Sequence, residues 1–138
     1  MSENMGRFTM FVLVVALLVL VLSNLYRLSA ATTVELSVTP MVCQPPCTLR
    51  MVVRIEKHPD NRWLVLSWCD VVDFAGTCGS STMQLEGETM VDRSDLAKDL
   101  PKGVYNVSAQ LFRKNYENRV GNDEKMVYVG VNPADYLP

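Results

Sequence analysis

The N-terminal part of the chain carries one long hydrophobic run. Residues 8–22 are apolar except for Thr9. Extended to Tyr26, the run has nineteen residues, which in a helix cover about 28 Å, close to the thickness of the hydrocarbon layer of a membrane. One arginine flanks the run on each side, as interfacial residues flank membrane spans. The pattern predicts a single transmembrane helix at residues 8–27, preceded by a short tail at residues 1–7.

A cleaved signal peptide is the alternative interpretation of this run. Residues 29–31 are small, and cleavage after Ala31 would release everything that follows. Two charges argue against cleavage: Arg27 lies between the run and the cleavage site, and Glu3 adds an acidic residue to the N-terminal region. We therefore expect a retained signal anchor, with residues 28–32 as a linker, while secretion after cleavage near Ala31 stays open. Both interpretations place the rest of the chain outside the cytoplasm.

After the linker, apolar and polar residues alternate with the period of two that is typical of half-buried strands. In the first such segment, three apolar residues alternate with Glu35 and Ser37. Turn-forming residues interrupt the chain about every 8 to 15 residues. The pattern predicts an all-β fold, a seven-strand antiparallel sandwich at residues 33–131, followed by a C-terminal tail at residues 132–138. The seven strands are expected near residues 34–38, 49–56, 63–69, 82–86, 89–96, 105–112 and 125–131.

Three of these segments resemble bacterial immunoglobulin-like domains of the polycystic-kidney-disease type. Such domains carry a Thr-Pro or Ser-Pro turn before strand B, a Trp or Asp near the end of strand C, and a Gly-x-Tyr-x-Val sequence at the start of strand F. Here Pro40, the Trp-Cys-Asp at residues 68–70 and the Gly-Val-Tyr-Asn-Val at residues 103–107 occupy these places. The chain departs from the family where Trp-Cys-Asp-Val at residues 68–71 replaces a Trp-x-Phe-Gly-Asp-Gly segment. The resemblance implies an immunoglobulin-like sandwich that serves as a spacer or an interaction module.

The composition narrows the range of functions. The chain has 138 residues, of which 49% are hydrophobic and 20% charged, enough apolar material for the core of one domain. A net charge of −2 offers no basic field for nucleic acid. The single histidine, His58, lies in a turn before Pro59, and the sequence has no phosphate-binding loop, nucleophile elbow or metalloprotease motif. We expect no enzymatic activity, no cofactor and no metal site.

Four cysteines follow the hydrophobic run: Cys43, Cys47, Cys69 and Cys78. In an oxidising compartment they would form two disulfides, and the simplest pairing, Cys43–Cys47 with Cys69–Cys78, closes two short loops. A zinc site is the weaker alternative, because the second spacing does not suit zinc modules. In a sandwich of this type, the turn after the first strand and the end of the third strand share one end of the domain. All four cysteines should therefore gather at that end, and crossed pairings remain open.

The loop after Cys69 holds the most unusual group of side chains. Asp70 and Asp73 are three residues apart, and Phe74 is an apolar residue in a loop that we expect to be exposed. Two carboxylates alone do not supply the six or more oxygen ligands that Ca²⁺ takes. Because the first strand starts next to the anchor, the cysteine end of the domain should point away from the membrane and the turn at Pro59 toward it. We expect a protein partner to bind the cysteine end through Asp70, Asp73 and Phe74.

The two tryptophans, Trp63 and Trp68, are five residues apart on one expected strand and should face opposite sides of it. One should belong to the core; the ring of the other either packs under a neighbour or stacks on a sugar. Together these observations predict a non-catalytic, membrane-anchored interaction module with its C-terminal domain in the periplasm or at the cell surface. An accessory subunit of an envelope or membrane complex, with a protein partner of unknown identity, fits this prediction. The alternative is an exported domain that binds a carbohydrate or another small molecule.

Overall fold

The computed structural model describes residues 2–28, 33–73 and 76–137, except for the side chains of residues 2–5, 8 and 23–28. The chain divides into two compact units, Met1–Ala31 and Thr32–Pro138. The first unit is helical and the second is made of strands.

The first unit contains the helix α1, Ser2–Leu28. The side chains of residues 10–22 in this helix are apolar and exposed. Among the described residues, no helix is long and apolar enough to cross a membrane. The predicted transmembrane helix at residues 8–27 includes Phe8 and residues 23–27, whose side chains lie outside the described part of the structure.

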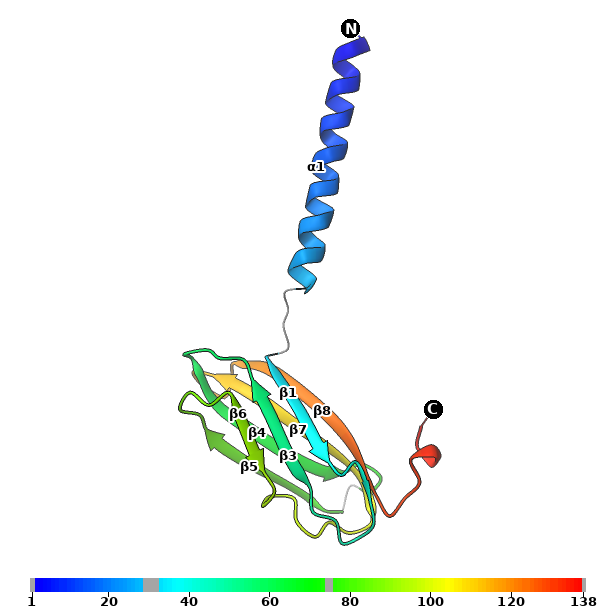
Figure 1. Cartoon of the computed structure of the whole chain (residues 1–138), viewed down its shortest axis with the longest axis vertical. Helices are drawn as coiled ribbons and strands as arrows, with labels where there is room; N and C mark the ends of the chain where they lie inside the picture. Colours follow the sequence, from blue (N-terminus) through cyan, green and yellow to red (C-terminus); the bar gives the residue numbers. More distant parts are fainter. Residues whose placement is uncertain (1, 29–32, 74–75, 138) are drawn as a thin grey trace. The chain divides into compact units, whose positions relative to one another are not determined.

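The second unit is an all-β domain whose two sheets lie face to face (Figure 1). The three-stranded sheet has the order β1-β3-β6, and the five-stranded sheet has the order β2-β8-β7-β4-β5. Neighbouring strands are antiparallel except β2 and β8, which are parallel. In chain order the elements are β1 Val34–Thr39, β2 Val42–Cys43, β3 Arg50–Ile55, β4 Asn61–Asp70, β5 Cys78–Gln84, β6 Met90–Arg93, β7 Gly103–Arg113, β8 Arg119–Val129 and the short 3-10 helix η1 Pro133–Asp135.

The hydrophobic core lies between the two sheets, because alternate residues of each strand point toward the opposite sheet. In β1, for example, Val34, Leu36 and Val38 are buried while the residues between them are exposed. Burial of a side chain of this size stabilises the fold by about 1.5–3 kcal/mol. The predicted β-sandwich is confirmed, and its core comes from the alternation seen in the sequence.

Trp68 is the tryptophan that belongs to the core. Gly79 lies opposite it on β5. A Cβ atom on Gly79 would collide with the indole of Trp68. Position 79 therefore requires a glycine, because the ring lies directly against the backbone of β5. Trp63 lies on the other face of β4, where its ring stacks on Tyr116 at a centroid distance of 5.1 Å.

The prediction of seven strands is wrong, because the described residues form eight. The additional strand, β2, has only two residues, and its pairing with Tyr128 and Val129 of β8 defines it. A two-residue strand is too short to show a periodic pattern. β5 and β8 also begin earlier than expected, at Cys78 and Arg119, because their small or polar first residues pair with the longer strands β4 and β7.

The sandwich has two ends with different contents. Cys43 pairs with Val129, and Cys69 pairs with Cys78, and the register of β4, β7 and β8 brings these pairs to the same end of the domain. We call this the cysteine end. The opposite end holds the turn at Pro59, whose neighbour Asp60 accepts a hydrogen bond from the backbone N–H of Lys114. The predicted gathering of the cysteines at one end is confirmed.

Candidate functional site

The first disulfide of the cysteine end joins Cys43 and Cys47. It closes the turn between β2 and β3, and Cys47 is buried. The backbone of Cys47 also exchanges two hydrogen bonds with Leu100, at 3.1 and 2.8 Å. This disulfide therefore ties the turn after β2 to the segment that leads into β7.

The second disulfide joins Cys69 and Cys78. These two residues are direct neighbours across β4 and β5, and their Cα atoms are 4.1 Å apart. One residue further along, the backbone N–H of Asp70 donates to the carbonyl of Thr77 at 3.0 Å. The loop between the strands is thus closed by a covalent bond and a hydrogen bond at its base. Both pairings are the simplest ones that the sequence allowed.

Asp70 organises this loop from inside. Its side chain is only 6% exposed, and one carboxylate oxygen, Oδ1, accepts hydrogen bonds from the backbone N–H groups of Val72 and Asp73 at 3.0 and 3.2 Å. A Cβ atom on Gly103 would lie 2.6 Å from the other oxygen, Oδ2, so the chain of β7 passes close to this carboxylate. The side chain caps the start of the loop, as aspartates do in turns.

The three residues predicted to bind a partner therefore differ in their positions. Asp70 is buried within the loop, whereas Asp73 is exposed. Phe74 lies outside the described residues, as does Ala75. Among the described residues, no group of three or more histidine, cysteine, aspartate or glutamate side chains is placed to hold a metal ion.

Tyr105 packs beneath the same loop and is fully buried. Its hydroxyl donates a hydrogen bond to the carbonyl of Pro101 at 2.8 Å, four residues earlier in the chain. Burial raises the pKa of Tyr105; the hydrogen bond with Thr77 opposes this rise and the negative charge of Asp70 adds to it. The hydrogen bond of the hydroxyl makes this side chain a structural link between β7 and the turn before it.

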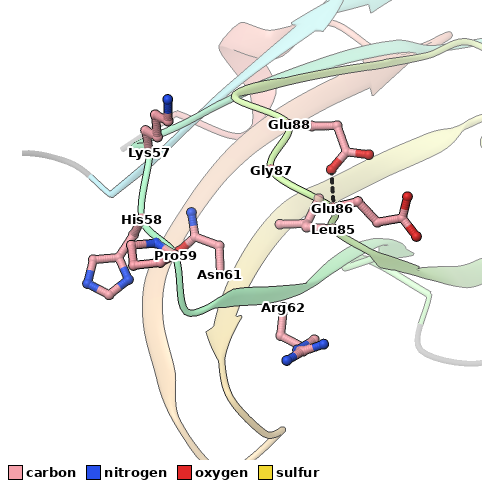
Figure 2. Close-up of a pocket in the computed structure, with 9 residues that line it drawn as sticks. All are labelled: Lys57, His58, Pro59, Asn61, Arg62, Leu85, Glu86, Gly87 and Glu88. Carbon is pink, nitrogen blue, oxygen red and sulfur yellow. Dashed lines mark hydrogen bonds between the residues drawn. The ribbon is translucent and has the colours of Figure 1, made fainter.

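The opposite end of the domain carries a cavity of about 370 Å³ that the sequence did not predict. It lies between the turn that joins β3 to β4 and the turn that joins β5 to β6 (Figure 2). The cavity has basic groups on the first turn and acidic groups on the second. Its lining consists of Lys57, His58, Pro59, Asn61, Arg62, Leu85, Glu86, Gly87 and Glu88.

Several polar groups of this cavity are engaged in the turns themselves. His58 accepts a hydrogen bond at Nδ1 from the backbone N–H of Asp60, at 3.0 Å. Asn61 donates to the carbonyl of Glu56 at 2.7 Å and accepts from the side chain of Arg113 at 3.1 Å. Glu88 accepts from a backbone N–H in its own turn, which lowers the pKa of its carboxyl. These bonds shape the cavity wall; they do not converge on one point within it.

The ring of Trp63, the tryptophan outside the core, is not free to stack on a ligand. The ring of Trp63 is half-buried and is stacked on Tyr116, which also contacts Phe112 at a centroid distance of 5.9 Å. The sequence left two possibilities for this ring, and the structure shows it packed against a neighbour. The spacing of the two tryptophans predicted that they lie on opposite faces of their strand. The contact of Trp63 with Tyr116, in the loop after β7, depends on the tertiary structure.

Comparison with protein-family models and with curated proteins finds no match to this chain.

Proposed function

We propose that the chain is a non-catalytic interaction module, held in a membrane by its N-terminal segment and exposed on the extracytoplasmic side as an immunoglobulin-like domain. An accessory subunit of an envelope or membrane complex, in the periplasm or at the cell surface, is the role that fits these parts. The observation that carries the proposal is the combination of an exposed apolar helix with a domain closed by two disulfides.

The topology supports the immunoglobulin-like assignment. The sheet β1-β3-β6 corresponds to strands A, B and E of such domains, and β5-β4-β7-β8 corresponds to C′, C, F and G, with the short β2 beside G. The hydrogen bond from Tyr105 to the carbonyl of Pro101 supplies a second feature, because a tyrosine near the start of strand F makes this bond in immunoglobulin domains.

The properties of the N-terminal helix support the membrane anchor. From Met10 to Leu22 its large apolar side chains are between 45% and 69% exposed. Leaving such a continuous apolar surface in water would cost about 25 cal/mol for each Å². A lipid environment removes this cost, and a helix satisfies its own backbone hydrogen bonds there.

The disulfides support the extracytoplasmic location, because disulfides persist in oxidising compartments and are rare in the cytosol. A direct test is mass spectrometry of the full chain purified from native membranes in the presence of a thiol-alkylating reagent. Without prior reduction we expect no alkylated cysteine, and after reduction we expect four. Four alkylated cysteines without reduction would contradict the extracytoplasmic location.

The surface that binds a protein partner stays a prediction, and we place it at the cysteine end. Because Asp70 is buried, the prediction now depends on Asp73 and Phe74. Its test is a pair of variants, in which capture of the native partner by crosslinking in membranes is measured. We expect Asp73→Ala with Phe74→Ala to lose capture and the control Arg119→Ala, at the opposite end, to retain it. The reverse result would move the partner to the end that holds the turn at Pro59.

The cavity favours one alternative, an exported domain that binds a small molecule. Its volume of about 370 Å³ lies within the range of small-ligand sites. The lysine and arginine on one side and the two glutamates on the other would suit a small zwitterionic ligand. A sugar would fit less well, because none of the lining residues is a Phe, Tyr or Trp on which a sugar ring could stack. A glycan array and a thermal-shift screen with amino acids would distinguish this alternative from the interaction module.

A further inference from the structure

β5 is an edge strand of the five-stranded sheet in the described part of the chain, and it differs from the other edges. It has seven residues, Cys78–Gln84, and none of them is charged or a proline. Its register with β4 runs without interruption from Trp63↔Gln84 to Cys69↔Cys78. Long, regular, uncharged edges are the ones that accept another strand.

The other three edges are protected by recognised means. β1 is covered by β8, because the backbone N–H of Leu36 donates to the carboxylate of Asp123 at 2.7 Å. β2 has two residues and is followed by two prolines. β6 has four residues, of which Asp92 and Arg93 are charged. Short strands, charges and covering groups all oppose pairing with another chain.

The hydrogen-bond pattern shows which groups of β5 face outward. The backbone N–H of Leu85 donates to the carbonyl of Arg62, and that of Asp70 donates to the carbonyl of Thr77. In an antiparallel pair such bonds recur at every second residue, so the odd-numbered residues of β5 bond to β4. The even-numbered residues, Cys78, Ser80, Thr82 and Gln84, therefore direct their N–H and C=O groups away from β4, toward the free edge.

This edge is complementary to itself. A two-fold axis at Ser81 places Ser80 opposite Thr82 of the second copy and Cys78 opposite Gln84 of the second copy. All four are residues with outward backbone groups, so each of these pairs can exchange two hydrogen bonds. No charge meets a like charge, and the side chains that meet on the outer face at the centre are hydroxyls, as they are within the sheet, where Ser67 and Ser108 are 2.6 Å apart.

We infer that two copies of this chain associate through β5, in antiparallel register about Ser81, to form one continuous sheet. The inference rests on the edge of the folded domain alone. Because the paired strands run in opposite directions, the cysteine ends of the two copies point in opposite directions, which differs from the orientation expected for a domain whose cysteine end points away from the membrane. It gives a symmetric dimer with the same patch used on both copies. The second copy supplies an edge of the same length, without charges and with its outward backbone groups in the matching register.

The first test measures the mass of the full chain in detergent by light scattering and by sedimentation over a concentration series. We expect a dimer that dissociates on dilution. The variant Thr82→Lys places a positive charge on the outer face of the edge, and the two lysines of a dimer would be diagonal neighbours across the axis. Because like charges repel, the dissociation constant of the dimer should rise roughly tenfold. The matched control Thr89→Lys, an exposed residue outside β5, should leave the dimer unchanged.

Two outcomes would overturn the inference. One is a monomer at every concentration; the other is a dimer that Thr82→Lys does not weaken, which would place the contact elsewhere, for example in α1. Circular dichroism of Thr82→Lys should match that of the parent chain, because Thr82 is exposed.

A second test determines the register. Residues at a non-hydrogen-bonded antiparallel pair have Cα atoms about 4.5 Å apart, within the range that a disulfide spans. Ser81→Cys should therefore form an intermolecular disulfide under mild oxidation, identified by peptide mapping, and Met83→Cys should not, because its partner in this register is Gly79 of the second copy. Crosslinking of Met83→Cys in preference to Ser81→Cys would contradict the proposed axis.

Discussion

At the scale of single residues, two polar side chains join elements by hydrogen bonds that add to the contacts of the hydrophobic core. Tyr105 connects the start of β7 to Pro101, and Asp123 of β8 covers the edge of β1. The first contact lies at the end of a sheet, where β7 begins, and the second lies at the edge of the three-stranded sheet. Both contacts are therefore suited to test by a single substitution.

Tyr105→Phe removes the hydroxyl while retaining the ring in the core. The lost hydrogen bond to Pro101 should lower the free energy of unfolding by about 1 kcal/mol. Urea unfolding followed by tryptophan fluorescence measures this difference. The control is Tyr116→Phe. Tyr116 is 54% exposed, so this substitution should change the free energy of unfolding by less than about 0.5 kcal/mol. Equal losses in the two variants would show that the Tyr105 hydroxyl contributes no specific stability.

Asp123 makes the stability of the domain depend on acid pH. Burial favours its neutral form, but the backbone N–H of Leu36 and the ammonium of Lys125 outweigh this, and the pKa of Asp123 lies below its ordinary value. A carboxylate with a lowered pKa in the folded state contributes stability above the unfolded value, near 4, and loses it as the pH falls through the folded value.

The variant Asp123→Asn should therefore be less stable than the parent at pH 7, and the difference should shrink as the pH falls below about 4. Urea unfolding of both proteins between pH 7 and pH 3 measures it. A constant difference over this range would mean that the charge of Asp123 has no part in holding β1 to β8.

At the scale of elements, the two disulfides close loops of different length. Cys43 and Cys47 are separated by 4 positions, and Cys69 and Cys78 by 9. A crosslink stabilises mainly by restricting the unfolded chain, and the restriction grows with the length of the loop that it closes. The second disulfide should therefore contribute more to stability than the first.

We expect Cys69→Ala with Cys78→Ala to lower the free energy of unfolding by about 3 kcal/mol, and Cys43→Ala with Cys47→Ala by about 2 kcal/mol. Urea unfolding without reductant compares the two double variants with the parent. The four-alanine variant, which lacks both disulfides, should match the parent chain measured after reduction to within about 1 kcal/mol. A larger loss for the Cys43–Cys47 pair would indicate that its bond network with Leu100 outweighs the loop-length effect.

At the scale of the whole molecule, the proposed membrane anchor leads to a prediction about processing. Protein taken from native membranes should not begin at Thr32, because Arg27 interrupts the region before the cleavage site; N-terminal sequencing measures this. A variant without residues 1–31 should leave the membrane fraction. A chain that begins at Thr32 in native material would establish the cleaved signal peptide instead.

The sequence by itself determined the features that local patterns encode. The alternation in β1 and β3 predicted these strands, because one face of each is buried and the period of the side chains is two. The alternation also predicted β7, although residues on both of its faces are buried. The order of strands also placed all four cysteines at one end. The simplest disulfide pairing followed from loop length, since residues close in the chain meet at the smallest cost in entropy.

The tertiary structure alone decided the features that depend on contacts between distant segments. β2 exists only through its pairing with β8, and β5 extends back to Cys78 only because β4 continues beside it. The burial of Asp70, the cavity beside Pro59 and the open edge of β5 likewise arise where separate turns and strands meet. Periodicity reports which face of a segment is apolar, but it carries no information about which other segment will cover it.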